Sequence, residues 1–449
     1  MYDLAVLGGK IYQKGKWFNA NLFVKDGKIA KISNQEKQSG KKMDAAGKKV
    51  IPGLIDAHVH FAMASGSYMT ADDFATGSLA AAYGGVTTFI DFLDEQNTAE
   101  FLKKEFHRKF MLGQKSCLDF GLHAAVCDLA QESAEAIAEA ALGFGSPTVK
   151  LYTTYKPSAY SSPSTVRSMI KRSAKGDLLI LCHAEKDELL SFSSDLMAHL
   201  PANRPAIAER QQVKEIAEYL RQLGGWAYIV HTSCGSTIAM LKNDFEDILG
   251  KNLFLEGCPQ YFLLNEKVYF KPGAEQYAIT PPLRSQDESL LLKQNLSEIS
   301  VISTDHCLFL ADQKTGKPLS RMPMGMPGVE RSFGLMYALF GDRVIDRFTH
   351  NPAVLHGLFP QKGLISPGSD ADLCIFHETS LHRYGHEHSA GDFFPYLDFK
   401  VNIEIDTVIS RGDVIINDGK YYPHQGRYLH RKLDCTKIAE NLRWDARVS

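Results

Sequence analysis

The sequence IPGLIDAHVH, residues 51–60, decides the fold. It is an apolar run that follows a Pro-Gly turn and ends in His58 and His60, two positions apart. On a β-strand, the side chains of residues i and i+2 project to the same face, so both imidazoles can hold one metal ion. A histidine pair at a strand end also occurs as an ordinary polar pair. The turn before this pair and the neighbouring Asp56 favour a metal site.

Beyond this stretch, apolar runs alternate with longer segments of helical composition. The runs are residues 87–92 (TTFIDF), 119–126 (DFGLHAAV), 178–183 (LLILCH), 227–231 (AYIVH) and 300–305 (SVISTD). Repeated units of a strand followed by a helix predict parallel strands. In a chain of 449 residues they predict an α/β fold with a closed (β/α)8 TIM-like barrel, which we assign to residues 51–364.

Both ends of the chain have a different texture, with short β-like runs separated by glycine turns. They include residues 4–7 (LAVL), 17–24 (WFNANLFV) and 28–33 (KIAKIS) near the start, and 369–376 (SDADLCIF), 403–410 (IEIDTVIS) and 413–417 (DVIIN) near the end. This antiparallel pattern predicts one small β-sandwich domain, built from residues 1–50 and 365–430, with the barrel inserted between its parts.

The last stretch, residues 431–449, is charged and carries Ile438, Leu442 and Trp444 at helical spacing. This pattern predicts an exposed C-terminal tail or helix, placed to touch a second subunit.

Composition narrows the class of partner. The 50 basic and 52 acidic residues give a formal net charge of −2, so there is no electrostatic footprint for nucleic acid or an anionic membrane. A small-molecule substrate is favoured. The start of the chain lacks a secretory signal, and no run approaches the roughly 20 apolar residues that span a bilayer, which predicts a cytoplasmic protein. The eight cysteines are scattered singly, which predicts reduced thiols and no cysteine-ligated zinc site.

Four further polar residues end strand-like runs: Lys150 after PTV, and His183, His231 and Asp305 at the ends of the runs quoted above. The C-terminal ends of barrel strands meet at one mouth, where barrel enzymes build their sites. A single histidine at a strand end is more often a structural hydrogen-bonding residue. Together with the histidine pair, however, these residues offer nitrogen and oxygen donors suited to zinc, with manganese, cobalt or nickel as substitutes.

Lys150 fits such a site only if it is modified. A protonated ammonium has no lone pair for a metal and repels it. Reaction with carbon dioxide converts the amine into an anionic carboxylate that can bridge two ions. The alternative, a salt-bridging lysine, leaves the cluster one bridging anion short.

In combination, these motifs resemble the dihydropyrimidinase and hydantoinase branch of the amidohydrolase superfamily over nearly the whole chain. The resemblance rests on IPGLIDAHVHF at 51–61, DDFATGSLAAAYGGVTTFIDF at 72–92, VKLYTTY at 149–155, CHAE at 182–185, HTSCG at 231–235, EGCPQY at 256–261, TPPLR at 280–284, STDHC at 303–307, GVER at 328–331, Asn351-Pro352 and KGLISPGSDADL at 362–373.

The resemblance implies an enzyme that uses two divalent ions, Zn²⁺ by preference, to open hydantoin or dihydropyrimidine rings to N-carbamoyl amino acids. His58, His60 and Asp305 would serve the first ion and His183 and His231 the second, with carboxylated Lys150 as the bridge. Asp305 would also shuttle the proton, and Tyr155 would hydrogen-bond the developing oxyanion, its alternative being simple aromatic packing. The resemblance further implies a homo-oligomer, a tetramer or dimer.

Substrate choice is less fixed. Dihydroorotases carry an arginine shortly after the histidine pair, whereas FAMASGSY at 61–68 has no cation, which favours uncharged rings. Two expected substrate-binding positions depart from the family pattern: Thr280 replaces the usual serine and Met324 the usual asparagine. Uracil-pathway specificity is therefore not implied, and an allantoinase or dihydroorotase-type cyclic amidase stays an alternative. A non-enzymatic scaffold, similar to the dihydropyrimidinase-related proteins that lack metal ligands, is disfavoured because every ligand position is filled here.

Overall fold

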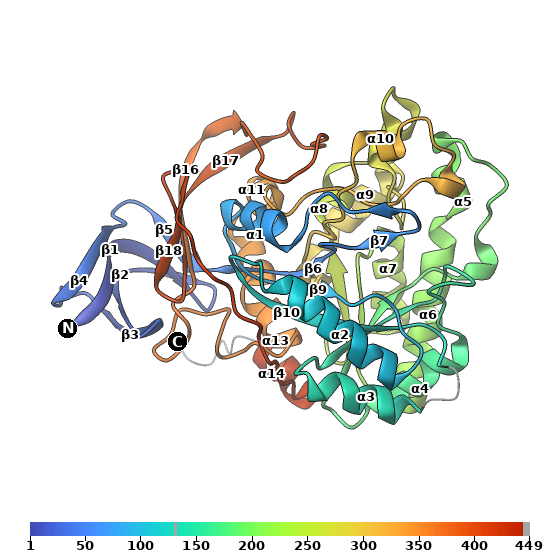
Figure 1. Ribbon diagram of the computed structural model, residues 1–449, viewed down its shortest axis with the longest axis horizontal. Helices are drawn as coiled ribbons and strands as arrows, with labels where there is room; N and C mark the ends of the chain where they lie inside the picture. Colours follow the sequence, from blue (N-terminus) through green and yellow to red (C-terminus); the bar gives the residue numbers. More distant parts are fainter. Residues whose placement is uncertain (130–132, 443–449) are drawn as a thin grey trace.

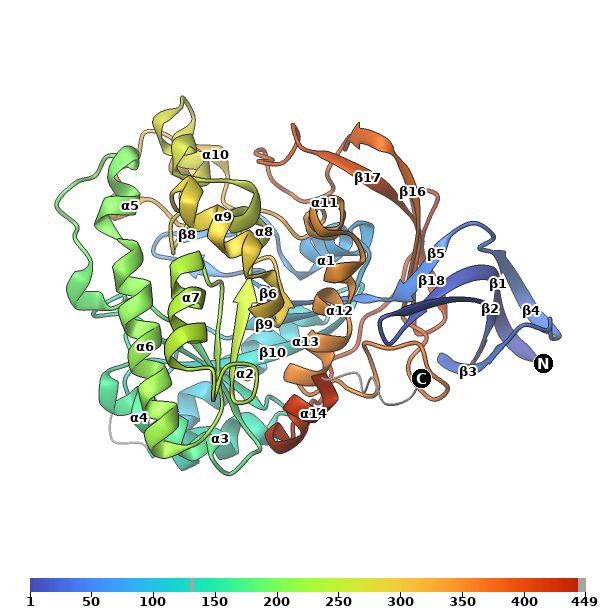
Figure 2. The same ribbon diagram turned by 180° about the vertical axis from the view of Figure 1, so that it is seen from behind.

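The computed structural model describes residues 1–129 and 133–442, and its central element is a parallel barrel (Figures 1 and 2). Its eight strands follow one another around the barrel in chain order. They are β6 (Leu54–Val59), β9 (Val86–Phe92), β10 (Asp119–Val126), β11 (Thr148–Tyr152), β12 (Leu179–His183), β13 (Ala227–Ile229), β14 (Leu253–Gly257) and β15 (Val301–Ile302). A parallel bridge between Val59 and His306 joins the first strand to the segment after the last. The predicted (β/α)8 barrel is confirmed.

Helices surround the strands (Figure 2). The longer ones are α1 (Phe74–Tyr83), α2 (Ala99–Gly113), α3 (Ala134–Gly143), α4 (Pro163–Ser173), α6 (Ala206–Leu223), α7 (Gly235–Asp244), α9 (Gln286–Gln294) and α11 (Ser332–Phe340). Shorter ones are α5 (Leu200–Asn203), α8 (Pro259–Leu263), α10 (Ala311–Lys314), α12 (Ile345–Phe348), α13 (His350–Leu355) and α14 (Ile438–Leu442). Because helices cover the outside and side chains fill the inside, strands such as β9 and β10 are buried along their whole length. The sequence also marks helix starts: the Ser162 hydroxyl accepts the Thr165 N–H, and Pro163 opens α4.

A second, nine-stranded sheet draws on both ends of the chain, as predicted. Its strands are β1 (Tyr2–Gln13), β2 (Lys16–Lys25), β3 (Lys28–Ser33), β4 (Ser39–Asp44), β5 (Lys49–Pro52), β16 (Leu373–Arg383), β17 (Lys400–Ser410), β18 (Asp413–Asn417) and β19 (Lys420–Tyr421). The two halves meet where β5 pairs in parallel with β1 and antiparallel with β16. Because β5 runs to Pro52, the first barrel strand begins at Leu54, slightly later than the expected boundary after residue 50. A small hairpin, β7 (Ala64–Ser65) and β8 (Tyr68–Met69), follows the first barrel strand.

A buried ion-pair cluster joins this outer sheet to the barrel. Lys362 Nζ lies 2.9 Å from a carboxylate oxygen of Asp119 at the start of β10, 2.5 Å from Asp372 and 3.3 Å from Asp370. Arg411 also pairs with Asp119. These three carboxylates lie close enough to hold a metal ion, but the Lys362 ammonium already occupies their centre. The cluster therefore acts as an internal salt bridge between the domains.

The C-terminal segment, predicted to be an exposed tail or helix, forms the helix α14 over Ile438–Leu442, but several of its described residues are buried against the barrel. Arg431 is buried and donates hydrogen bonds to the carbonyls of Leu122 and His356. Cys435 and Ile438 are buried as well, and Cys435 N–H donates to the Gly176 carbonyl just before β12. The apolar residues at helical spacing cover the N-terminal end of the barrel, because that end would otherwise expose its core. Trp444 lies outside the described residues. Within those residues, no helix is both long and apolar enough to span a membrane.

Candidate metal centre

Three predicted ligands meet at the barrel mouth. His58 Nε2 and His60 Nε2 lie 3.2 Å apart, and Asp305 Oδ1 lies 3.1 Å from the first and 3.2 Å from the second. One donor atom from each residue falls within 4.8 Å of the others. Because β6 sends both imidazoles to the same side, two nitrogens and a carboxylate converge as the sequence predicts. Imidazole nitrogens and carboxylate oxygens are ligands that divalent zinc accepts.

The other two histidines lie beside this group. The ring centroids of His183 and His231 are 4.5 Å apart, and the His231 ring is 5.5 Å from the His58 ring. His183 Nε2 is 2.7 Å from Glu185 Oε2, so its Nδ1 is left to face the site. His231 Nδ1 is buried, and among the described residues it has no hydrogen-bond partner. A buried polar atom without a partner is costly, and a bound ion would satisfy it.

Lys150 completes the predicted set. It lies on β11, is buried, and has its Nζ 4.8 Å from the centre of the Phe92 ring. His58 and His60 pack against the same ring, at centroid distances of 4.6 and 5.1 Å. Burial lowers the pKa of Lys150 to about 8, against the opposing pull of Asp305. An appreciable share of uncharged amine is thus present near neutral pH, and this is the form that reacts with carbon dioxide.

Burial and nearby charges set the protonation of the site. Burial lowers the pKa of His60 and of His183 to about 4, so both imidazoles are neutral at pH 7. For His58, burial also lowers the pKa, but the carboxylates of Glu256 and Asp305 outweigh it and raise the value to about 9. Burial raises the pKa of Asp305, yet His58 and the other imidazoles hold it well below its usual range. In the metal-free site His58 is therefore an imidazolium near pH 7, with a proton on each ring nitrogen.

Three of the predicted site residues have an uncommon backbone conformation. Tyr155, His231 and Asp305 adopt φ angles of +73°, +38° and +52°. Residues other than glycine rarely adopt a positive φ angle, because it strains the backbone. Such strain persists where surrounding contacts enforce it, often at functional sites. Each of the three residues lies just beyond the end of its strand, β11, β13 or β15.

Glu256 at the end of β14 is a functional residue that the sequence analysis assigned no role. Its Oε1 accepts the Nδ1–H of His58 at 2.7 Å and the backbone N–H of His231 at 2.8 Å. Its Oε2 accepts the Tyr228 hydroxyl at 2.9 Å. One buried carboxylate therefore orients two predicted ligands, as partners of metal-binding histidines commonly do. The sequence signal that could have identified Glu256 is its position near a strand end, within EGCPQY.

Glu185 and Arg204 form a second supporting pair that sequence reasoning missed. Arg204 Nη2 donates to Glu185 Oε2 at 2.5 Å, and the same carboxylate bonds His183. The Arg204 guanidinium also packs 5.1 Å from the centre of the Tyr155 ring. The pair thus fixes one predicted ligand and the predicted oxyanion residue together. The signal was the acid two residues after His183 in CHAE.

The predicted substrate-binding residues are only partly brought together. The Tyr155 hydroxyl and Thr280 Oγ1 are 2.6 Å apart, and burial raises the pKa of Tyr155, which keeps its hydroxyl protonated. Met324 is partly buried against the barrel's apolar core. Its link to this pair is indirect, through the Gly325 N–H, which donates to the Ala278 carbonyl at 2.8 Å.

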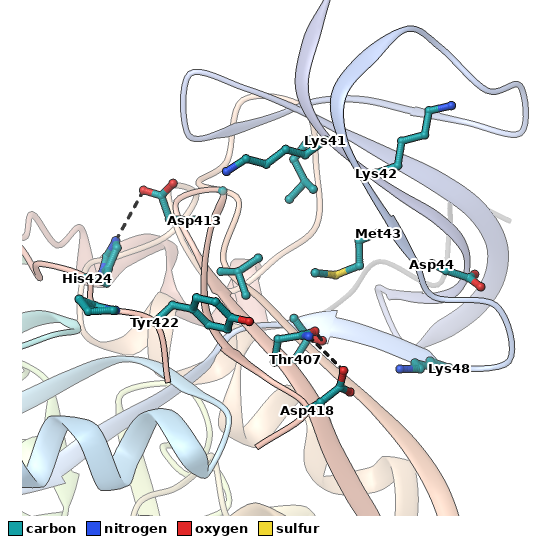
Figure 3. Close-up of a pocket in the computed structure, with 15 residues that line it drawn as sticks. Lys41, Lys42, Met43, Asp44, Lys48, Thr407, Asp413, Asp418, Tyr422 and His424 are labelled. Carbon is teal, nitrogen blue, oxygen red and sulfur yellow. Dashed lines mark hydrogen bonds and ion pairs between the residues drawn. The ribbon is translucent and has the colours of Figure 1, made fainter. Parts of the chain in front are cut away.

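A hollow of about 740 Å³ lies on the outer sheet rather than at the barrel mouth (Figure 3). Lys41, Lys42 and Asp44 of β4 line one side, and Asp413 and His424 lie on the other. None of the predicted site residues lines it. Its mixed charges favour no particular ligand.

The model of the amidohydrolase family matches residues 49–415. The chain belongs to this family. The D-hydantoinases of Streptomyces coelicolor and Geobacillus stearothermophilus are 28% and 29% identical to it, over 94% and 95% of this chain and 96% of each relative. The D-phenylhydantoinase of Escherichia coli strain HS is 30% identical over 92% of this chain and 94% of its own.

Solved structures give the same result for the fold of this amidohydrolase. A D-hydantoinase crystal structure superposes with a TM-score of 0.89 at 27% identity, covering 96% of this chain and 99% of that one. The D-hydantoinase from Bacillus sp. AR9 superposes with a TM-score of 0.90 at 26% identity, with the same coverage. These relatives place the amidohydrolase in the hydantoinase branch, as the motifs predicted.

Membership of the family implies a binuclear site for divalent metal ions. The donors of this amidohydrolase fit such a site on two observations: the ring nitrogens of His58 and His60 face each other beside Asp305, and His231 Nδ1 lacks a partner within the described part of the chain. Imidazole and carboxylate donors suit borderline divalent ions such as zinc.

We expect metal affinity to rise with pH between about 6 and 9. His58 must lose its proton to become a ligand, and its pKa of about 9 means that a metal ion competes with that proton at lower pH. One released proton corresponds to roughly a tenfold gain in affinity per pH unit, and carboxylation of Lys150 adds to the dependence below about pH 8. Competition with a chelator of known affinity at pH 6, 7, 8 and 9 measures this slope.

Glu256→Gln is the matched control, because it removes the carboxylate that keeps the proton on His58. The slope should become shallower in this variant. Equal wild-type affinities at pH 6 and pH 9 would contradict the protonated His58.

Proposed function

We propose that this chain is a binuclear metal-dependent cyclic amidase that opens hydantoin or dihydropyrimidine rings to N-carbamoyl amino acids. The observation that carries the proposal is the meeting of His58, His60 and Asp305 at the barrel mouth, with His231 next to them. His58 and His60 come from the end of β6, and the other site residues come from the ends of different barrel strands, which only the folded barrel unites. The names of the hydantoinase relatives support the choice of ring.

His58, His60 and Asp305 would hold one ion, and His183 and His231 the other, with carboxylated Lys150 between them. Two bound divalent ions would supply a nucleophilic hydroxide near neutral pH and an electrophile for the ring carbonyl. The protein's residues supply the rest of the chemistry. The protonated Tyr155 hydroxyl, held by Thr280, donates a hydrogen bond to the carbonyl oxygen as negative charge develops there.

Asp305 moves the proton in this proposal. Its carboxylate is ionised in the metal-free site, where His58 and the other imidazoles hold its pKa well below the usual range. Binding to a metal ion would favour the same ionised form. Asp305 therefore accepts the proton that the attacking hydroxide still carries and passes it to the leaving ring nitrogen, acting first as base and then as acid. Proton transfer to the nitrogen completes cleavage of the carbon–nitrogen bond, and the ring opens.

The charges at the mouth favour rings without a carboxylate. The residues after His60 carry no cation, and the arginine that packs over Tyr155, Arg204, is already paired with Glu185. A dihydroorotate carboxylate would therefore enter without a counter-charge from these residues, at a cost in binding energy. Met324 offers no polar side chain, so contacts to the ring amides in that segment would come from backbone groups.

A substrate panel tests the function. Metal-loaded enzyme is offered hydantoin, 5-substituted hydantoins, dihydrouracil, allantoin and dihydroorotate, and kcat/KM is ranked. We expect the hydantoins and dihydrouracil to exceed dihydroorotate by at least about a hundredfold, since an unpaired charge must be desolvated. Dihydroorotate or allantoin in first place would overturn the proposal in favour of that type of cyclic amidase.

Asp305→Asn should retain much of its metal but lose activity. An amide cannot accept and return the proton, so kcat should fall by at least about a hundredfold. Metal analysis and steady-state kinetics on the same preparation separate the two effects. The control is Asp312→Asn, an exposed acid on α10, which should behave as wild type. Wild-type activity in Asp305→Asn would refute its role.

Lys150→Ala should lose the bridging anion, and with it bound metal and activity. Short carboxylic acids such as acetate can enter the vacated space and should restore part of both, whereas wild-type enzyme should gain nothing from them. Mass spectrometry of gently handled wild-type protein tests directly for the added carboxyl group. An alanine variant that is fully loaded and active without acid would argue against the bridge.

Zinc as the native ion, the homo-oligomeric state and the cytoplasmic location stay predictions of the sequence.

A further inference from the structure

Lys314 is a buried lysine that the proposed chemistry does not use. It ends the short helix α10, where its neighbours Asp312, Thr315 and Gly316 are exposed while its own side chain is 1% exposed. Its Nζ donates to three backbone carbonyls: Ala278 at 3.1 Å, Gln276 at 3.4 Å, and Gly325. An ammonium has three N–H groups, so these acceptors use all of them.

The three carbonyls belong to two segments that reach the site from different parts of the chain. Residues 276–280 end in Thr280, whose hydroxyl contacts Tyr155 at 2.6 Å. Residues 322–326 lie beside Asp305: the Cys307 N–H donates to the Met326 carbonyl at 3.0 Å, and His306 forms a bridge with Met326. The two segments therefore carry Thr280 and Met324, two of the predicted substrate-binding residues.

The two segments are also packed tightly against each other and their surroundings. The Gly325 N–H donates to the Ala278 carbonyl, which also accepts from Lys314. A Cβ at Gly325, where φ is +159°, would collide with the Cys307 carbonyl. Gln276 Nε2 donates a hydrogen bond of 3.2 Å to Thr315 Oγ1, directly after α10. Lys314 thus lies where α10 and both segments meet.

The contacts of Lys314 are strongest when its amine is protonated. Its Nζ donates hydrogen bonds to carbonyl oxygens, and burial lowers its pKa to about 7, so the ammonium and the amine coexist near neutral pH. Taking an ammonium out of water is costly unless it is well hydrogen-bonded, and charge-assisted bonds are stronger than neutral ones. The contacts of Lys314 connect the two segments and fix their geometry.

We propose that Lys314 is a positioning residue that clamps residues 276–280 to residues 322–326 and so sets the spacing of the pocket that receives the ring amides of the substrate. The identification of this substrate as a cyclic amide rests on the proposed function. Loss of the clamp should loosen the pocket and leave the metal ligands in place, because His58, His60, His183 and His231 come from other elements. Asp305 keeps its own contacts with His58 and His60. Substrate binding should suffer more than the chemical step.

The test compares Lys314→Met and Lys314→Gln with wild type. Methionine keeps the length and apolar stem without donors, and glutamine restores two N–H groups without charge. We expect KM for hydantoin to rise by roughly tenfold or more in Lys314→Met, with kcat changed by less than about threefold and metal content unchanged. Lys314→Gln should lie between wild type and Lys314→Met.

Lys362→Met is the control, because Lys362 is an equally buried lysine at the junction of barrel and outer sheet. It should lower the melting temperature and leave KM unchanged. An unchanged KM in Lys314→Met would overturn the proposal. So would a joint fall of kcat, metal content and melting temperature with no selective rise in KM, since that pattern indicates only a structural role.

Hydrogen exchange separates this proposal from the proposed function. Backbone amides in residues 276–280 and 322–326, including Gly325 N–H, should exchange faster in Lys314→Met and at the wild-type rate in Lys362→Met. If wild-type enzyme opens none of the cyclic ureides, the proposed function fails, and exchange alone decides the clamp. Unchanged exchange in both segments would overturn it.

Discussion

The buried carboxylate of Glu256 is the contact on which the rest of the site depends. It binds the outer nitrogen of His58 and the backbone N–H of His231, which belong to different strands. The first bond aims His58 Nε2 at Asp305, and the second holds His231 in a backbone conformation that its side chain disfavours. A negative charge at this depth is tolerated because three donors surround it, including the Tyr228 hydroxyl.

The rest of the barrel serves the same end. Apolar strands buried on both faces leave little freedom in the position of each strand end, so polar side chains there are fixed by packing rather than by loops. The outer sheet lies to one side of the barrel (Figure 1), and Lys362 with its three aspartates connects the two. Contacts that hold the barrel strands in place therefore extend beyond the mouth. Arg431, for example, donates a hydrogen bond to the carbonyl of Leu122 within β10.

Much of the fold, and the meeting of His58, His60 and Asp305, could be predicted because they follow from local rules. Alternation on a strand puts His58 and His60 on one side, and strand-helix repeats bring the later strand ends to the same mouth. The supporting residues could not be predicted in this way. Glu256 lies 198 positions from the histidine that it binds, and nothing local to either residue encodes that contact. The burial of the C-terminal segment could not be predicted for a related reason. Its charged residues are typical of an exposed tail, but its few apolar residues pack on a surface formed by strands that are distant in the sequence.

The pairing of β5 with β16 also constrains how the protein is made. The N-terminal strands emerge first from the ribosome, but the edge of β5 that receives β16 stays unpaired until Cys374, the partner of Ile51, has been synthesised. An open strand edge is prone to pair with other chains. The nascent protein therefore carries an incomplete sheet with an aggregation-prone edge while the entire barrel is synthesised. The yield of folded protein in cells depends on the length of this period as well as on the stability of the finished fold.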